Sequence, residues 1–155
     1  MENILIHCND FSKARKEIGK NKKKSIIFSS NDDELNRKIL ENEKINILLL
    51  NQSHRKDRFK QRNSGFNHIL ARIAKKNNIA IGINLDEILE NKGEEKAKIL
   101  ARIKQNIKFC SKNKIKTEFV SVKGNKRNIY DLKSLGLILG MPTWMTKELE
   151  LISVK

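Results

Sequence analysis

Short apolar runs alternate with amphipathic stretches along the whole chain. The runs have the length expected for strands, and they lie at residues 4–6, 25–28, 45–50, 79–85 and 117–122. Between them, apolar residues recur every three or four positions, which is the spacing of one helical face. No short turn signal joins two neighbouring runs as a hairpin. The alternation therefore predicts an α/β fold with a parallel sheet and right-handed crossovers, in a single domain over residues 1–155.

Polar residues indicate where the helices begin. Asp10 or Ser12 suits the start of a first, weak helix. Residues 32–34 are all acidic, and acidic side chains in a first turn interact favourably with the positive end of a helix. The longest helix is expected after the turn at Gly93, and the last over residues 129–140.

The helix after the third strand has one apolar face and one cationic face. Its apolar positions follow the spacing i, i+3, i+4, i+7 and i+8, and are Phe66, Ile69, Leu70, Ile73 and Ala74. Arg72 and Lys75 lie off this stripe, towards water. We therefore expect the helix to be buried on one side and basic on the other.

The charge balance is strongly positive, with 33 Lys and Arg against 18 Asp and Glu, a formal net charge of +15. Such an excess favours binding to a polyanion. Nucleic acid is favoured over anionic lipid, because no basic amphipathic helix with a large apolar face lies at a terminus. The alternative is a compositional bias towards lysine, which explains the lysines better than it explains arginines gathered in one loop.

Five cations follow the third strand within eight positions, with Asp57 the only acid among them: Arg55, Lys56, Arg58, Lys60 and Arg62. Functional residues of α/β folds gather at the carboxyl ends of strands. Mutual repulsion predicts a poorly ordered loop until an RNA backbone supplies counter-charge, whereas the alternative is a solvated loop. Asn67 and His68, at the start of the next helix, suit phosphate or ribose, and Asn67 equally suits a plain helix cap. Aromatic residues are few, so we expect recognition of RNA backbone and shape rather than sequence.

Motifs for catalysis are missing from the sequence. There is no P-loop, no G-x-S-x-G and no G-x-G-x-x-G after a strand. His7, His54 and His68 stand at unrelated spacings, so neither a catalytic nor a metal site is expected. Cys8 and Cys110 do not suggest a disulfide framework. The chain shows no signal-peptide core and no apolar run long enough for a membrane, so we expect a cytoplasmic protein.

Two segments resemble one known family. Residues 55–57 read R-K-D and residues 64–74 read S-G-F-N-H-I-L-A-R-I-A. Together they resemble the R-K-D-x-G-x-N-H-V-L-A-x-x-A segment of ribonuclease P protein component 3, the archaeal relative of the eukaryotic thirty-kilodalton subunit. Residues 131–141, D-L-K-S-L-G-L-I-L-G-M, are similar to its closing R-D-L-x-x-L-G-x-x-x-G-M helix. Weaker similarities at residues 79–85, 101–111 and 119–121 extend the match over most of residues 45–141.

The resemblance implies a TIM-barrel-like fold related to the PHP-type hydrolases. The chain starts late against the family pattern, so we expect an incomplete barrel of about five strands with an open edge. Residues 58–63 resemble an insertion between R-K-D and S-G-x-N-H. Ile129 and Tyr130 stand where the family has Pro-Arg.

The function that the resemblance implies is that of a subunit of ribonuclease P, the ribonucleoprotein endoribonuclease that removes 5′ leaders from precursor tRNA. Catalysis and its divalent metal, Mg²⁺, are expected on the RNA subunit, and this chain is expected to bind no cofactor. Its expected partners are ribonuclease P RNA, precursor tRNA, protein component 2 and the other ribonuclease P proteins. The residues predicted to contact RNA are Arg55, Lys56, Asn67, His68, Arg72 and Lys75, followed by Lys104, Lys108 and Arg127. The alternatives are a stand-alone RNA-binding module and a PHP-type metal phosphoesterase, which would need an H-x-H motif that this chain lacks.

Overall fold

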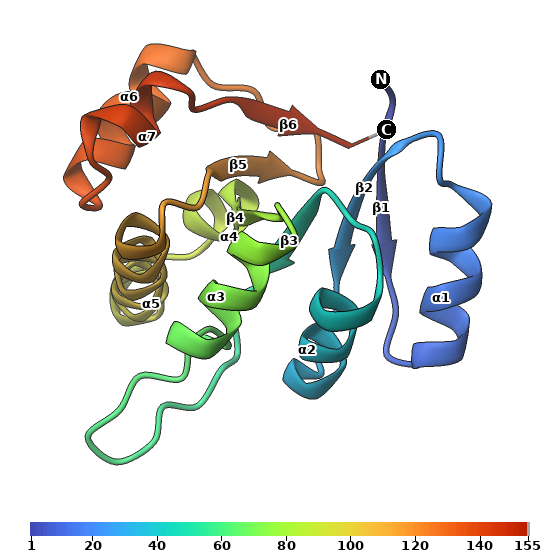
Figure 1. Cartoon of the computed structure of the whole chain (residues 1–155). Coiled ribbons are helices and arrows are strands. Elements are labelled where there is room, and N and C mark those ends of the chain that lie inside the picture. The colour runs from blue at the N-terminus through green and yellow to red at the C-terminus, as the bar shows by residue number, and fades with distance from the viewer. Residues whose placement is uncertain (155) are drawn as a thin grey trace.

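A computed structural model describes residues 1–154 and contains strands and helices in near-regular alternation (Figure 1). The strands are β1 Asn3–His7, β2 Ser25–Ser29, β3 Ile47–Leu50, β4 Ala80–Asn84, β5 Thr117–Ser121 and β6 Leu151–Ser153. The helices are α1 Phe11–Lys20, α2 Asp33–Asn42, α3 His68–Lys76, α4 Leu85–Glu90, α5 Gly93–Asn113, α6 Ile129–Ile138 and α7 Thr143–Lys147.

The six strands form one parallel sheet in the order β1-β2-β3-β4-β5-β6. The sheet curls into a half-barrel with the helices outside it, which confirms the predicted TIM-barrel-like, incomplete architecture (Figure 1). The prediction of five strands was one too few, because β6 has only three residues and no apolar run marks it. The side chain of Asn3 donates a hydrogen bond to the Ser153 carbonyl, 3.5 Å away, and so links the first and last strands.

Apolar side chains fill both faces of the sheet. The larger core lies between the convex face and the helices, and β3 contributes Leu48 and Leu50 to it. A smaller cluster lines the concave face, where Ile47 and Leu49 of the same strand meet Val120. All four residues of β3 are therefore buried, as expected for a continuous apolar run covered on both sides.

The helix that follows the basic loop is rotated relative to the predicted stripe. Its buried residues are Leu70, Ala71 and Ala74, whereas Ile69 is 48% exposed. Phe66 lies before the helix, buried edge-on against Phe109 at a ring-centroid distance of 6.3 Å. Because a residue outside the helix provides this anchor, the apolar spacing counted from Phe66 misplaced the buried face.

The fourth strand is shorter than predicted, because α4 starts immediately after it. Asn84 ends β4 and caps α4, its side-chain oxygen accepting hydrogen bonds from the backbone N–H of Asp86 (3.0 Å) and of Glu87 (3.4 Å). Leu85 is therefore the first residue of a helix rather than the last of a strand. Helix α7 was also not predicted, and α6 ends at Ile138, two residues early.

Candidate nucleic-acid interface

The basic loop, residues 51–67, joins β3 to α3 at the end of the sheet where the strands finish, which we call the carboxyl rim. It projects beyond α2 and α3 as an extended excursion of the chain (Figure 1). Lys56, Arg58, Lys60 and Arg62 are all exposed on it. The predicted placement of a cation-rich loop at a strand end is therefore confirmed.

A buried arginine from α5 holds the base of this loop. The side chain of Arg102 is only 1% exposed, and its guanidinium donates to Asp57 Oδ1 (3.0 Å), Gln52 O (2.9 Å) and Arg55 O (2.8 Å). Arginine suits this task because its planar group presents several donors in fixed directions. Three points of the loop are thereby fixed to one helix.

Asp57 transmits this restraint further along the loop. Besides the bond from Arg102, its Oδ1 accepts a hydrogen bond from the backbone N–H of Asn63 (2.8 Å). The hydrogen bond from Arg102 and then that from Asn63 hold the pKa of Asp57 below its usual value, so the carboxylate is charged at neutral pH. The loop therefore has an internal hydrogen-bonded frame that is formed without RNA.

Arg55 belongs to this frame rather than to the exposed surface. Its guanidinium forms a two-point ion pair with Asp33 of α2, with both N–O distances 2.9 Å, and its Nε donates to Asn51 O at 2.7 Å. The side chain is only 12% exposed. This corrects the expectation for Arg55: its donors point into the protein, so it positions the loop.

Gly65 makes room for the Arg55–Asp33 pair. Its φ is +73°, in the left-handed region that favours glycine. A Cβ at this position would lie 2.5 Å from Arg55 Nη2 and 2.8 Å from Asp33 Oδ1. The structure thus explains why R-K-D and S-G occur together in this chain.

We expect Gly65→Ala to lower the free energy of unfolding by at least about 1–2 kcal/mol, the cost of a left-handed non-glycine residue. The new methyl group should also displace the Arg55–Asp33 pair. Gly19→Ala is the matched control, because Gly19 lies in α1 and a Cβ there meets nothing within 4 Å. Chemical denaturation of both variants checks the prediction, and equal stabilities would contradict it.

The six residues 58–63, predicted to be an insertion, fold back on themselves. Arg58 N–H donates to Gln61 O (2.9 Å) and Gln61 N–H donates to Arg58 O (3.0 Å). Phe59 and Lys60 form the two-residue tip, and Lys60 has a φ of +63°. We call residues 58–61 the loop hairpin.

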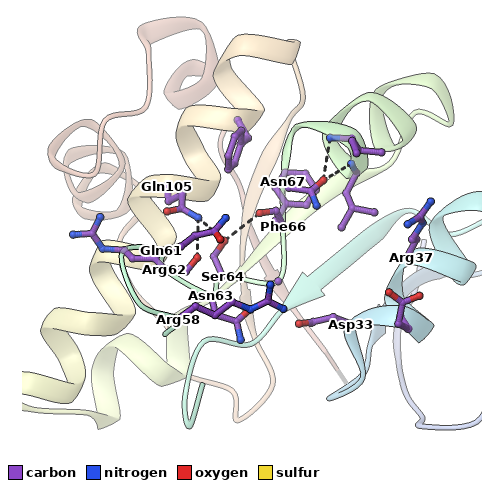
Figure 2. A pocket seen from close by; sticks show the side chains of 15 residues that line it. Asp33, Arg37, Arg58, Gln61, Arg62, Asn63, Ser64, Phe66, Asn67 and Gln105 are labelled. Atoms are coloured by element: carbon purple, nitrogen blue, oxygen red, sulfur yellow. Dashed lines mark hydrogen bonds between the residues drawn. The ribbon is translucent and has the colours of Figure 1, made fainter. Parts of the chain in front are cut away.

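A cavity of about 270 Å³ lies between the loop hairpin, α2, α3 and α5 (Figure 2). Arg58 and Arg62 line it from the loop, and neither forms an ion pair with a carboxylate among residues 1–154. Across the cavity, Asp33 and Arg37 are already paired, with Arg55 and Glu41 respectively, whereas Glu34 contributes a negative charge that forms no ion pair among residues 1–154. The cavity therefore carries free positive charge on its loop side.

Amide side chains complete the cavity wall. Gln105 of α5 donates from Nε2 to Ser64 Oγ (3.2 Å) and Arg62 O (3.4 Å) (Figure 2). Asn67 accepts hydrogen bonds on Oδ1 from the N–H groups of Ile69 (3.0 Å) and Leu70 (2.9 Å), so it does cap α3. Its side chain also lines the cavity, where its amide nitrogen can bond a ligand. Gln105 was not predicted, because its distance from the loop in sequence hides the contact.

The other residues predicted to contact RNA spread over a wider surface. Lys56, His68 and Arg72 are exposed, as are Lys104 and Lys108 along α5.

Two of the predicted residues, Lys75 and Arg127, lie away from the basic loop. Lys75 donates a hydrogen bond to Lys114 O (2.9 Å) at the opposite end of the sheet. Arg127 precedes α6, which is also distant from the loop (Figure 1). Both residues therefore lie outside the basic loop, and their contact with RNA stays a prediction.

Asp86 organises the loop that follows β5. Its carboxylate, 3% exposed, accepts hydrogen bonds from Ser121 Oγ (2.9 Å), Val122 N (2.7 Å), Lys123 N (3.1 Å) and Asn125 Nδ2 (2.8 Å). Burial acts to raise its pKa, but the four hydrogen bonds together outweigh it and hold the pKa below the usual value. This buried acid at the strand ends is engaged with the protein itself.

Potential metal ligands do not cluster in the part of the chain that the structure describes. No group of three or more His, Cys, Asp or Glu side chains among residues 1–154 is arranged to hold a metal ion. His7, at the end of β1, has its Nδ1 within 2.7 Å of Ser29 Oγ. Within the same range, no helix combines the length and apolar character needed to cross a membrane.

The fold and the basic loop define a TIM-barrel-like α/β protein with a cationic carboxyl rim. Residues 3–149 match the family model described as RNase P subunit p30, and the chain belongs to that family.

Individual relatives agree with this assignment. The chain is similar to ribonuclease P protein component 3 of Methanococcus maripaludis strain C7, with 28% identity over 91% of this chain and 56% of the relative. It is 29% identical to that of Methanocaldococcus jannaschii over 84% of this chain and 55% of the relative. With Methanosarcina acetivorans the identity is 31%, over 79% and 48% of the two chains. The chain thus spans about half the length of these relatives.

One solved structure shares the fold. A chain in the cryo-EM structure of archaeal ribonuclease P with mature tRNA superposes with a TM-score of 0.75 at 24% identity. The match covers 94% of this chain and 62% of that chain. At this identity the likeness establishes the fold.

Proposed function

We propose that this chain acts as a protein subunit of ribonuclease P and binds the RNA through the basic loop. One observation carries the proposal. In a member of this family, Arg58 and Arg62 line an open cavity without forming an ion pair among residues 1–154, on a loop that Arg102 fixes from within. Unpaired guanidinium groups held in place are suited to phosphate, which they bind with two parallel hydrogen bonds.

The frame of the loop contributes to binding by ordering it in advance. A loop that is fixed before RNA arrives loses less conformational entropy when it binds. Positive charge alone does not identify the basic loop as the RNA-binding site, because Lys22 and Lys23 are also exposed, at the opposite end of the sheet. We assign RNA binding to the basic loop because unpaired arginines, a cavity and amide groups lie together there. We place Lys56, Asn67 and His68 beside this centre and Arg72, Lys104 and Lys108 at its periphery.

In this proposal the RNA subunit performs the cleavage of precursor tRNA with Mg²⁺, and this chain holds no catalytic residue or cofactor. The engagement of Asp86 with four protein donors supports this division, since it leaves that carboxylate little capacity for a metal or a water. The partners are ribonuclease P RNA, precursor tRNA, protein component 2 and the other ribonuclease P proteins, in the cytoplasm.

A second candidate function is a stand-alone RNA-binding module. It is favoured by the unpaired guanidinium groups of Arg58 and Arg62, because such groups suit the phosphates of any RNA. Reconstitution separates the two functions. Precursor tRNA cleavage should be measured with ribonuclease P RNA and the other protein subunits of the source organism, with and without this chain. Faster cleavage with the chain present supports the subunit, whereas RNA binding without any effect on cleavage supports the module.

Salt dependence tests whether the arginines meet phosphate. For the double variant Arg58→Ala/Arg62→Ala, we expect the slope of log affinity for ribonuclease P RNA against log salt to fall by about 0.7–0.9 for each phosphate that is no longer neutralised. Lys22→Ala/Lys23→Ala removes the same charge from the opposite end of the sheet, and its slope should match that of the unmodified chain. Equal slopes for the two double variants would contradict the proposed site.

A further inference from the structure

The tip of the loop hairpin exposes an aromatic ring to solvent. Phe59 is 91% exposed, whereas Phe66, the other aromatic residue of the loop, is only 5% exposed. Leaving a large apolar side chain in water forgoes about 1.5–3 kcal/mol of burial. The loop therefore presents one aromatic ring that remains almost fully open to solvent.

The surroundings of this ring are cationic. Lys60 Nζ lies 5.4 Å from the centre of the Phe59 ring, and Arg58 precedes it in the chain. An exposed apolar patch for a protein partner is expected to be larger and to contain several apolar side chains. A single ring among cations instead matches sites for single-stranded nucleic acid, where aromatic faces stack on bases and cations follow the phosphates.

Hydrogen bonds hold the loop hairpin in place for such a contact. The paired hydrogen bonds between Arg58 and Gln61 close the tip. Below it, Asp57 connects Asn63 to the buried Arg102. The ring is thus carried on a short, braced projection rather than on an open loop.

We propose that Phe59 is a stacking residue that rests on an unpaired base of the bound RNA, while Arg58, Lys60 and Arg62 bind the flanking phosphates. This inference rests on the proposed RNA-binding function. It adds recognition of an unstacked base to the recognition of backbone and shape.

The test compares two labelled RNA hairpins that differ only in one bulged adenine. We expect Phe59→Ala to weaken binding of the bulged hairpin by at least about fivefold, the lower end of the range for one stacked base. Binding of the fully paired hairpin should change by less than about twofold. The salt slope should stay unchanged, because no charge is removed. Ile138→Ala is the control, since Ile138 is 76% exposed on α6, away from the loop.

Phe59→Trp should bind the bulged hairpin as tightly as the unmodified chain does, unlike Phe59→Ala. Stacking on the base should quench the fluorescence of the added tryptophan. The unmodified chain, with Trp144 as its one tryptophan, gives the reference emission.

The possible results distinguish failure of the stacking role from failure of the proposed RNA-binding function. If the chain binds both hairpins and Phe59→Ala binds them equally well, the stacking role is overturned while RNA binding stands. The same result, combined with weaker assembly of Phe59→Ala with the other subunit proteins, would assign the ring to a protein partner instead. If neither hairpin nor ribonuclease P RNA binds the unmodified chain, the proposed function itself fails.

Discussion

Replacing Arg102 by Met is expected to lower the free energy of unfolding by about 3–5 kcal/mol. The methionine keeps the apolar stem of the side chain but removes every donor. Asp57 then loses its charged partner and keeps only the bond from the Asn63 N–H, and the carbonyl groups of Gln52 and Arg55 lose the donors from Arg102. Unsatisfied acceptors in a buried site cost more than the hydrogen bonds contribute when made. Chemical denaturation measures the change directly.

The loss of local stability in Arg102→Met should be greatest in the basic loop. Trypsin cleaves after Arg and Lys, so the loop offers it several sites once the frame opens locally. We expect faster cleavage within residues 55–62 of Arg102→Met under native conditions. Lys98→Met on the same helix is the control, because Lys98 is exposed and its ion pair with Glu94 contributes little. Equal cleavage rates in the two variants would show that Arg102 does not hold the loop.

Asp86→Asn is expected to cost about 3 kcal/mol of stability at neutral pH. The substitution keeps the shape of the side chain and removes its charge. The backbone N–H groups of Val122 and Lys123 then lose a charged acceptor, and hydrogen bonds to charged groups contribute about 1.5–3 kcal/mol each. Thermal or chemical unfolding of the two proteins gives the difference.

The pH dependence provides an internal check on Asp86. Because the folded pKa of this carboxyl lies below its usual value, its contribution is complete above about pH 5 and is lost as the pH falls through the folded pKa. The stability gap between the unmodified chain and Asp86→Asn should therefore narrow as the pH drops below about 4. A stability difference that stays constant from neutral to acid pH would mean that the charge of Asp86 does not stabilise the fold.

The sequence predicted the alternation of strands and helices because buried strands such as β3 are continuous apolar runs. The prediction was wrong where a strand is very short or where a capping residue starts a helix inside an apolar run. Strand β6 is only three residues long and is defined by its pairing with β5, as in the register of Phe119 with Leu151. Leu85 continues an apolar run but begins a helix, because Asn84 caps it.

The location of the candidate site was also predictable, since the cations of the basic loop are neighbours in sequence. Which of them faces inward was not. Arg55 forms an ion pair with Asp33, 22 residues away, whereas Arg58 forms no ion pair among residues 1–154. The role of Arg102 was hidden for a further reason. Its partners lie 45 to 50 residues away, and two of them are backbone carbonyls that every residue type possesses.

Lysine acetylation can show whether RNA binds the carboxyl rim at the basic loop, on which the proposed function depends. The chain should be acetylated alone and in complex with ribonuclease P RNA, and the rate at each lysine determined by mass spectrometry. We predict protection of Lys56 and Lys60 on the loop, with no protection of Lys22 and Lys23 at the opposite end of the sheet. Protection of Lys22 and Lys23 with unchanged rates at Lys56 and Lys60 would contradict binding at this rim.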